Sequence, residues 1–344
     1  VLCDVRKEIK AKTMHNHFTE QLINEMQLAL EAGEQIILFQ NRRGYSPLWE
    51  CESCGWVPMC TRCDVSLTYH KFSHQLRCHY CGYTTAPVPA CHACGSVDMK
   101  MLGFGTEKIE EDLQVHFPDV RVQRMDLDTT RSKSSYRKII SDFESGHTRI
   151  LVGTQMVTKG LDFDNVSLVG ILSADKMMNY PDFRAMERSF QIMLQVSGRA
   201  GRRNKRGKVL IQTYNPDHWL LDMITRGDYR SFYEREVKER YQFVYPPFVR
   251  LMRITLKHKD DAVVQRAAQE IQRLLVPVLK DRILGPERPY IPRINNYFLQ
   301  QFLVRFDKKK ESEAIKATVI QMMRLRLAES DFKQVRLSVD VDPL

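Results

Sequence analysis

Four Cys-x-x-Cys pairs lie within 44 residues of this chain and hold eight of its nine cysteines. One such tight loop presents two thiolates at the right spacing for a Zn2+ ion, and two loops complete a structural four-cysteine site. The sequence therefore predicts two structural zinc ions and a segment that buries little apolar surface and folds only with metal bound. The ninth cysteine, Cys3, lies far from the pairs and has no predicted role.

The alternative is that the pairs are redox-active or form a disulfide framework. A chain of 344 residues can build a hydrophobic core and needs no disulfide staples, which disfavours that alternative. Four histidines lie among the cysteines, but eight thiolates satisfy two ions without them. We therefore expect the histidines beside the metal sites or on the surface: they are His70, His74, His79 and His92.

Four pairs can be joined two by two in three ways. Five residues separate the first two pairs, whereas fourteen separate the second and third, and segments 65–69 and 75–77 alternate like a β-hairpin. That spacing is typical of a zinc ribbon. The prediction is a nested arrangement, with zinc 1 bound by Cys51, Cys54, Cys91 and Cys94 and zinc 2 bound by Cys60, Cys63, Cys78 and Cys81.

The composition sets outer limits. A hydrophobic content of 43% is ordinary for a globular protein, and a net charge of +10 favours a polyanionic partner such as nucleic acid. No apolar run approaches the roughly 20 residues that cross a bilayer, so we expect no membrane span. Residues 1–5 already have the pattern of an interior strand, so the chain is expected to be a fragment of something longer.

Helical and extended patterns alternate on both sides of the cysteine block. Phe18, Leu22, Met26 and Leu30 recur every four residues, and residues 36–39 follow as a buried strand. Such alternation predicts an α/β domain, a parallel sheet covered on both faces, with the cysteine block inserted after Phe39. Further strands are expected at 120–125, 149–153, 166–173 and 209–213, and further helices at 106–117, 134–144 and 183–196.

Functional residues of such sheets lie beyond the carboxyl ends of the strands, and we expect two unusual segments there. Segment 153–163 (GTQMVTKGLDF) directly follows a strand. Segment 195–202 (QVSGRAGR) ends a helix with two arginines three positions apart, which can direct two guanidinium groups at one phosphate. The alternative, a solvated basic turn, is favoured for Arg203, Lys205 and Arg206.

These segments carry a family resemblance. QVSGRAGR resembles motif VI of superfamily 2 helicases, and GTQMVTKGLDF resembles their motif V. With IILFQNRRGY (36–45), RMDLDTT (124–130), SADKMMNYPDFRAMERSFQ (173–191) and YPPFVRL (245–251), the chain resembles the PriA-type replication-restart helicases of bacteria, also called primosomal protein N′, over nearly its whole length. That family also has nested four-cysteine zinc sites inserted in its second helicase lobe.

The resemblance implies a nucleotide-facing set of residues. Arg202 matches the arginine finger that reaches the γ-phosphate of ATP, Arg199 matches its companion, and Gln195 matches the glutamine that organises this face. An arginine finger stabilises charge on the transferred phosphoryl group. Gly160 and Asp162 match positions that line the nucleotide cleft, although Asp162 can instead be read as a turn cap.

The resemblance also implies a DNA-facing set. Thr154, Gln155 and Lys159 match residues on the side of motif V that faces the DNA backbone, and Arg42 and Arg43 follow a strand as DNA-binding residues do in this family.

Beyond residue 245 the pattern changes to β-α-β-β-α-β, a ferredoxin-like plan. The family has a C-terminal domain of this size that is credited with DNA binding. Arg250, Arg253 and Arg293 are candidate phosphate contacts, with solvated strand-edge residues as the favoured alternative. The expected domains are a RecA-like helicase lobe 2 at 1–45 and 100–245, a zinc-binding insertion at 46–99 and an α+β domain at 246–344.

One departure from a complete motor is clear. The chain contains no GxxxxGK[ST] phosphate loop and no acidic pair for Mg2+, so the lobe that would bind ATP and Mg2+ is expected to be missing. The chain alone is therefore predicted neither to hydrolyse ATP nor to unwind DNA.

The resemblance implies that the whole protein is an ATP-dependent 3′-to-5′ DNA helicase of the bacterial cytoplasm. It would recognise stalled or abandoned forks and restart replication with single-strand-binding protein and primosome proteins. The rival is a non-enzymatic zinc-ribbon scaffold that binds nucleic acid, which leaves motifs V and VI unexplained. A different superfamily 2 translocase is disfavoured by the eight inserted cysteines.

Overall fold

The computed structural model describes residues 1–40, 48–51, 54, 56–70, 74–78, 80–102, 106–126, 129–130, 132–158, 163–180, 182–201, 207–307 and 311–343. The chain divides into two compact units. The first comprises Val1–Pro47 and Gly103–Glu234, and the second comprises Leu48–Leu102 and Arg235–Leu344. None of the helices in the described part of the chain is both long and apolar enough to span a bilayer.

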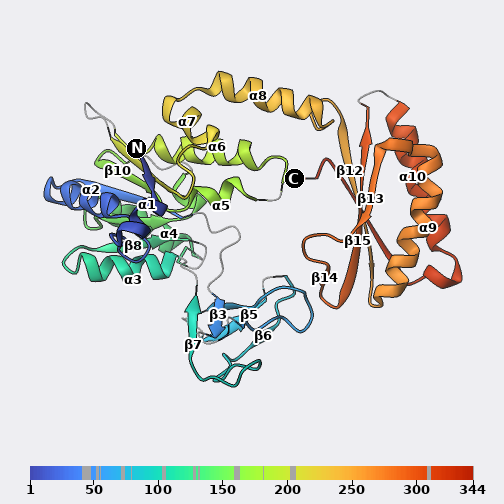
Figure 1. The fold of residues 1–344 in the computed structure, drawn as a ribbon, viewed down its shortest axis with the longest axis horizontal. Coiled ribbons are helices and arrows are strands. Elements are labelled where there is room, and N and C mark those ends of the chain that lie inside the picture. The colour runs from blue at the N-terminus through green and yellow to red at the C-terminus, as the bar shows by residue number, and fades with distance from the viewer. Residues whose placement is uncertain are drawn as a thin grey trace. The chain divides into compact units, whose positions relative to one another are not determined.

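The first unit is built on a six-stranded sheet in which every described pairing is parallel (Figure 1). Its strand order is β1-β11-β10-β2-β9-β8. The central strand β2 is buried at all five positions, as its unbroken apolar sequence predicts. The strands are β1 (Leu2–Asp4), β2 (Gln35–Phe39), β8 (Val122–Met125), β9 (Ile150–Gly153), β10 (Val166–Ile171) and β11 (Lys208–Thr213).

Helices cover both faces of this sheet, which confirms the predicted α/β lobe. Successive residues of β2 point to opposite faces: Ile36 and Leu38 pack with α2 and α3, whereas Ile37 and Phe39 pack with α4 to α7. The helices of this region are α1 (Val5–Ala11), α2 (Glu20–Glu31), α3 (Thr106–His116), α4 (Lys133–Glu144), α5 (Ala174–Met178), α6 (Ala185–Ser197), α7 (Trp219–Arg226) and α8 (Tyr229–Gln242).

The first strand differs from its sequence prediction. Residues 1–5 were expected to form an interior strand, but β1 lies at the edge of the sheet, beside β11, and ends at Asp4. The Asp4 carboxylate accepts hydrogen bonds from the backbone N–H groups of Arg6 and Lys7, which caps α1 and stops the strand. Cys3 is buried in the core beside this strand end.

The Cys-rich part of the second unit forms a small antiparallel sheet with the order β6-β5-β4-β3-β7. Its strands β4 and β5 pair as the hairpin that the alternation at 65–77 predicts. The strands are β3 (Leu48–Cys51), β4 (Thr68–His70), β5 (Gln75–Arg77), β6 (Thr84–Thr85) and β7 (Met99–Leu102).

The C-terminal part of the second unit has the ferredoxin-like plan predicted from its sequence. Its antiparallel sheet has the order β13-β15-β12-β16, with β14 paired to β15, and helices α9 and α10 pack on one face (Figure 1). The elements are β12 (Arg250–His258), α9 (Asp261–Leu279), η2 (Lys280–Arg282), β13 (Ile283–Glu287), β14 (Arg293–Ile294), β15 (Tyr297–Phe306), α10 (Glu311–Leu327), η3 (Ser330–Phe332) and β16 (Arg336–Val341).

Candidate functional site

A tight turn follows β9 at the carboxyl edge of the large sheet. The 3-10 turn η1 (Gln155–Thr158) folds back over the strand end, and the Val157 N–H donates to the Thr154 carbonyl at 3.1 Å. A Cβ on Gly153 would lie 2.0 Å from Val157 Cγ1, so only glycine fits there. Thr154 is buried and Gln155 half-buried, and these two predicted DNA contacts lie at the carboxyl edge.

Gln40 is a residue of this edge that the sequence analysis missed. It follows β2, its side chain is 1% exposed, and its backbone N–H donates to the Gly153 carbonyl at 2.9 Å. Neither side-chain amide atom has a hydrogen-bond partner in the described part of the chain. A buried amide left without a partner costs about 1–3 kcal/mol. The sequence feature that could have identified Gln40 is its position in the IILFQNRRGY segment. Arg42 and Arg43, in the same segment, are outside the described residues.

Hydrogen bonds of the RMDLDTT segment stabilise the same edge. Asp126 is 1% exposed; one carboxylate oxygen accepts from Thr106 Oγ1 at 2.5 Å, and the other accepts from the Thr129 N–H at 3.0 Å. The Thr130 hydroxyl lies 3.3 Å from Met156 Sδ in η1. The loop after β8 is therefore tied both to the start of α3 and to the turn that carries Thr154.

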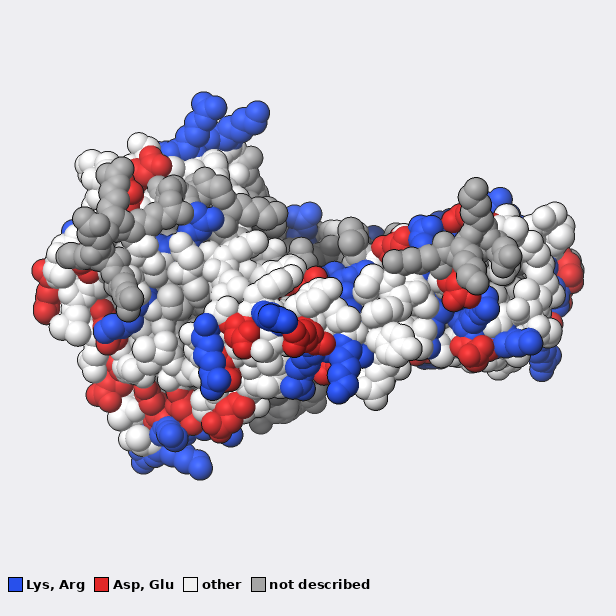
Figure 2. All heavy atoms as spheres, turned by 90° about the horizontal axis from the view of Figure 1, so that it is seen from above, with Lys and Arg blue, Asp and Glu red and all other residues white. Residues whose placement is uncertain are grey.

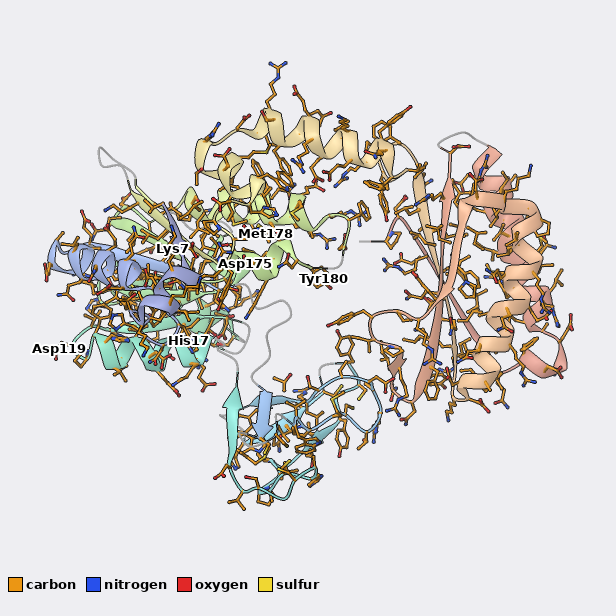
Figure 3. All side chains as sticks on the ribbon, viewed as in Figure 1. Lys7, His17, Asp119, Asp175, Met178 and Tyr180 are labelled. Atoms are coloured by element: carbon orange, nitrogen blue, oxygen red, sulfur yellow. The ribbon has the colours of Figure 1, made fainter. Side chains whose placement is uncertain are left out.

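The segment after β10 is fixed through Asp175, which Figure 3 labels on α5 together with Met178. Its two carboxylate oxygens accept from Thr213 Oγ1 at 2.8 Å and from the Tyr214 N–H at 2.9 Å. These bonds join α5 to the carboxyl end of β11. Desolvation by its neighbours lowers the pKa of Lys176, which keeps an exposed side chain, to about 8.

Basic side chains from two other places lie at the same edge. His17 precedes α2, and its Nε2 lies 3.4 Å from a carboxylate oxygen of Asp112 (Figure 3 labels His17). Lys108, in the first turns of α3, lies 2.9 Å from the other oxygen of Asp112. Burial lowers the pKa of His17 more than Asp112 raises it, and the charges of Lys108 and Lys176 act in the same direction as burial. These groups carried no recognisable sequence signal.

The arginine-bearing turn after α6 lies elsewhere than expected. The Gly201 N–H donates to the carbonyl of Val166 at 2.9 Å, and Val166 is the first residue of β10. The prediction that segment 195–202 lies at the carboxyl edge is therefore wrong. The reason is that α6 runs antiparallel to the strands, so the helix ends at their amino edge.

Gln195, in the last turn of α6, is exposed, and Arg199, in the turn that follows, is half-buried. The backbone at Gly207 packs tightly against the start of this turn. A Cβ on Gly207 would lie 2.3 Å from the carbonyl carbon of Ala200 and from the Gly201 nitrogen. Gly207 therefore brings the chain back against Ala200 and Gly201. Arg202 follows Gly201 in the sequence but is outside the described residues.

The motif V segment leads from one edge of the sheet to the other. It starts at Gly153 and Thr154 on the carboxyl edge, and the carbonyl of Asn165, just after the segment, accepts a hydrogen bond from the Gln35 N–H at the amino end of β2 at 2.9 Å. Phe163 anchors its second half, with its ring edge-on to Phe143 at 4.6 Å between centroids. Lys159, Gly160 and Asp162 lie in this segment but outside the described residues.

The eight paired cysteines gather into two groups. Within each group the sulfur atoms all lie within 4.8 Å of one another. A tetrahedral zinc with bonds of about 2.3 Å holds its sulfurs about 3.8 Å apart, so both groups have room for one ion. Sulfur separations are 3.6 Å for Cys51 and Cys94, 3.5 Å for Cys54 and Cys91, and 3.6 Å for Cys60 and Cys81. The groups are the ones that the spacing predicts: Cys51, Cys54, Cys91 and Cys94, and Cys60, Cys63, Cys78 and Cys81.

One backbone turn is repeated at all four pairs. The N–H of the first cysteine donates to the carbonyl five residues on, as for Cys60 and Val65 at 2.8 Å and for Cys91 and Ser96 at 2.7 Å. Burial raises the pKa of Cys91, but N–H donors from Cys94 and Ala93 outweigh it and bring the pKa to about 6. Such donors favour the thiolate, which is the form that binds metal.

Two of the neighbouring histidines have other partners. His74 Nδ1 lies 2.8 Å from the Tyr69 hydroxyl, and the His92 ring lies beside Trp56 at 5.2 Å between centroids. Neither belongs to a four-sulfur group.

Two of the three candidate arginines of the C-terminal part are held by carboxylates. Arg250 pairs with Asp342 at 2.7 Å and with Glu313 at 3.2 Å, and Arg293 pairs with Asp64 at 2.7 Å. Charge on α8 is balanced in the same way by three ion pairs at i,i+4 spacing. Figure 2 shows positive and negative side chains interspersed on the face it presents, so the excess charge of +10 is not gathered into one patch there.

Three family models match the chain. Residues 241–344 match the primosomal protein N C-terminal domain, residues 60–85 match the PriA DNA helicase Cys-rich region domain, and residues 98–204 match the helicase conserved C-terminal domain. The first and second of these models describe the same family.

Curated relatives named replication restart protein PriA match nearly the whole chain. The Bacillus subtilis (strain 168) protein is 39% identical over 345 residues, covering 99% of this chain and 42% of the relative. The Synechocystis protein is 36% identical over 351 residues (100% and 41%), and the Treponema pallidum protein is 42% identical over 288 residues (83% and 44%). The chain thus spans less than half the length of these relatives.

Proposed function

Because this chain belongs to the PriA family of replication restart proteins, we propose that it supplies the second RecA-like lobe of an ATP-dependent 3′-to-5′ DNA helicase. The lobe comprises residues 1–45 and 100–245, with a two-zinc insertion at 46–99 and a C-terminal domain at 246–344. In the longer protein this motor acts at stalled or abandoned forks and restarts replication by primosome assembly. Both zinc ions are structural, since four thiolates leave no open position for water.

The observation that carries this proposal is the separation of two functional edges on one sheet. Thr154 and Gln155 follow β9 at the carboxyl edge, whereas the Arg199 turn is bound to Val166 at the amino edge. A helicase lobe needs two separate sites, because one must bind a DNA strand while the other responds to the bound nucleotide. The two edges are joined by the motif V segment and by α6, which packs against η1.

We assign the nucleotide side to Arg199, Arg202 and Gln195, together with Gly160 and Asp162. ATP and Mg2+ would be held by the preceding lobe and supply the phosphoryl group whose developing charge the arginines stabilise. When the arginines bind the charged phosphoryl group, α6 would move toward the nucleotide. Because η1 packs against α6, it would move with the helix. Thr154, Gln155 and Lys159 would then shift their contacts on one DNA strand, and Arg42 and Arg43 are proposed as further DNA-binding residues.

The C-terminal domain offers a further DNA-facing surface. Met252, Ile254 and Leu256 point from β12 into the core with the helices, so the alternating Arg253 and Lys257 lie on the opposite face of the sheet. We propose that this face, rather than Arg250 and Arg293, contacts the phosphate backbone. Single-strand-binding protein and primosome proteins are the proposed protein partners.

The test is DNA-stimulated ATP hydrolysis by the chain extended N-terminally through a lobe with a phosphate loop. We expect Arg202→Ala to reduce turnover by about 10³ or more, as loss of an arginine finger does elsewhere. Arg206→Ala, in the same basic stretch of the sequence, is the matched control and should leave turnover near that of the parent. Turnover indifferent to Arg202 would contradict the motor and favour a zinc-ribbon scaffold.

A further inference from the structure

A turn of the C-terminal domain lies directly on a zinc-binding loop. The turn between β14 and β15, Arg293 to Asn296, runs beside the knuckle Thr61 to Asp64. The Asp64 N–H donates to the Arg293 carbonyl at 3.0 Å, and the Asn296 N–H donates to the Arg62 carbonyl at 2.7 Å. These two bonds join segments about 230 positions apart in the sequence.

Side chains reinforce this backbone pairing. Arg293 Nε donates to the Asp64 carboxylate at 2.7 Å, and another guanidinium nitrogen donates to the Thr61 carbonyl at 3.2 Å. Both charged side chains are partly shielded, with exposed fractions of 26% for Arg293 and 35% for Asp64. Ile294 packs against the small core around Cys63 and Leu67. The contact is thus charged at its rim and apolar at its centre, as specific interfaces are.

The decisive contact reaches a metal-binding sulfur. The backbone N–H of Asn295 donates to Cys63 Sγ at 3.0 Å. Cys60 Sγ, by contrast, accepts from Arg62 of its own knuckle at 3.4 Å. Asn295 and Asn296 have φ angles of +50° and +62°, and asparagine is among the residues that tolerate this left-handed region best. The turn therefore has the conformation that directs an N–H group at the sulfur.

We infer that the C-terminal domain completes the second zinc site, with Arg293 and Asn295 as positioning residues for the Cys63 thiolate. Four thiolates around one Zn2+ carry excess negative charge, and an N–H donor directed at one of them offsets part of it. The coupling is reciprocal: the domain slows loss of zinc 2, and zinc 2 holds the knuckle in the shape on which the domain docks. This inference rests on zinc binding and not on motor activity.

The first zinc site provides an internal comparison. Cys91 Sγ accepts N–H groups from Ala93 and Cys94, which belong to its own knuckle. General loosening of the second unit would expose both sites alike. Loss of the inferred contact should affect only the site that contains Cys63.

The experiment follows thiol modification by N-ethylmaleimide in the zinc-loaded 344-residue chain with a chelator present, mapped to each cysteine by mass spectrometry. We expect Arg293→Ala to accelerate modification of the second group about tenfold, the lower range for loss of an outer partner of a metal ligand. Asp64→Ala breaks the same contact from the other side and should act alike. The second group is Cys60, Cys63, Cys78 and Cys81, and the first, Cys51, Cys54, Cys91 and Cys94, should react at its parent rate.

Two further variants separate positioning from folding. Arg288→Ala removes an ion pair with Asp261 that stays within the C-terminal domain, and it should leave both groups unchanged. The double exchange Asp64→Arg with Arg293→Asp should restore slow modification of the second group. Equal acceleration of both groups, no acceleration of either, or rapid modification of the parent would each overturn the inference. None of these outcomes depends on ATP turnover, so failure here is distinct from failure of the proposed motor.

Discussion

Gly201 donates its backbone N–H to the carbonyl of Val166 at 2.9 Å, and this bond holds the end of α6 at the amino edge of the large sheet. Thr154 follows β9 at the carboxyl edge. The two halves of the predicted motor site therefore lie at opposite edges of one sheet, with the buried Phe163 and α6 between them.

The base of the arginine turn gives a first prediction. In Gly207→Ala the new Cβ would meet two backbone atoms at 2.3 Å, which cannot move aside as a side-chain end can. We expect a loss of about 1–3 kcal/mol in the free energy of unfolding, as for other overpacked sites. Gly198→Ala is the control, because its Cβ would meet only ordinary contacts at 3.4 and 3.6 Å. Urea unfolding measures both, and equal stability of the two variants would refute the close approach at Gly207.

The turn after β9 gives a second prediction. Gly153→Ala would press on Val157 Cγ1 and displace Thr154 and Gln155, so we expect weaker binding of single-stranded DNA in fluorescence anisotropy. Val157→Ala removes that methyl group, and the double variant should bind better than Gly153→Ala alone. This non-additive outcome is the signature of contacting residues. Strictly additive losses would mean that Gly153 matters for another reason.

Metal content gives a third prediction. The chain should hold two zinc ions by elemental mass spectrometry, and Cys78→Ala should hold one, because three thiolates no longer complete a tetrahedral site. Cys3→Ala should keep both ions, since Cys3 lies in the core of the other unit. Retention of two tightly bound ions by Cys78→Ala would show that Cys78 is not a ligand.

The same metal should hold the Cys-rich sheet together. After removal of zinc by a chelator, we expect hydrogen exchange to accelerate in β3, β4 and β5 and to stay slow in β2 and β9. The physical reason is that the core around Leu67 and Leu76 is small and includes three of the metal-binding cysteines. Unchanged exchange in β4 would contradict a structural role for the ions.

Acid sensitivity gives a fifth prediction. The hydrogen bond from Arg250 lowers the pKa of Asp342 below its ordinary value of 3.8, so folding favours the ionised carboxylate. The resulting stability is present above pH 3.8 and is lost as the pH falls through the lower folded-state pKa. Asp342→Asn should therefore be less stable than the parent at pH 7, and the difference should vanish at strongly acid pH. Asp340→Asn, on β16 just before Asp342, is the control in urea unfolding, and a difference that persists in acid would exclude this linkage.

Much of the fold follows from local pattern. The unbroken apolar run at 36–39 gave the central strand, the four-residue recurrence from Phe18 gave α2, and the β-α-β-β-α-β order gave the C-terminal sheet. These features depend on residues near one another in the chain, which periodicity reports directly. The edge position of β1 was not predictable in this way, because it depends on the pairing of β1 with β11, a strand far away in the sequence.

The sequence by itself determined two four-cysteine groups, an α/β lobe and the arginine-bearing motif. The reason is that the spacing of the cysteines and the periodicity of the apolar residues depend only on neighbouring positions in the chain. Only the tertiary structure decided that the arginine turn lies at the amino edge, that Gln40 is buried without an amide partner among the described residues, and that Asn295 reaches Cys63. Each of these depends on segments that are far apart in the chain and meet only when the strands are ordered. Local patterns specify elements, whereas the free energy of packing them selects which residues of different elements touch.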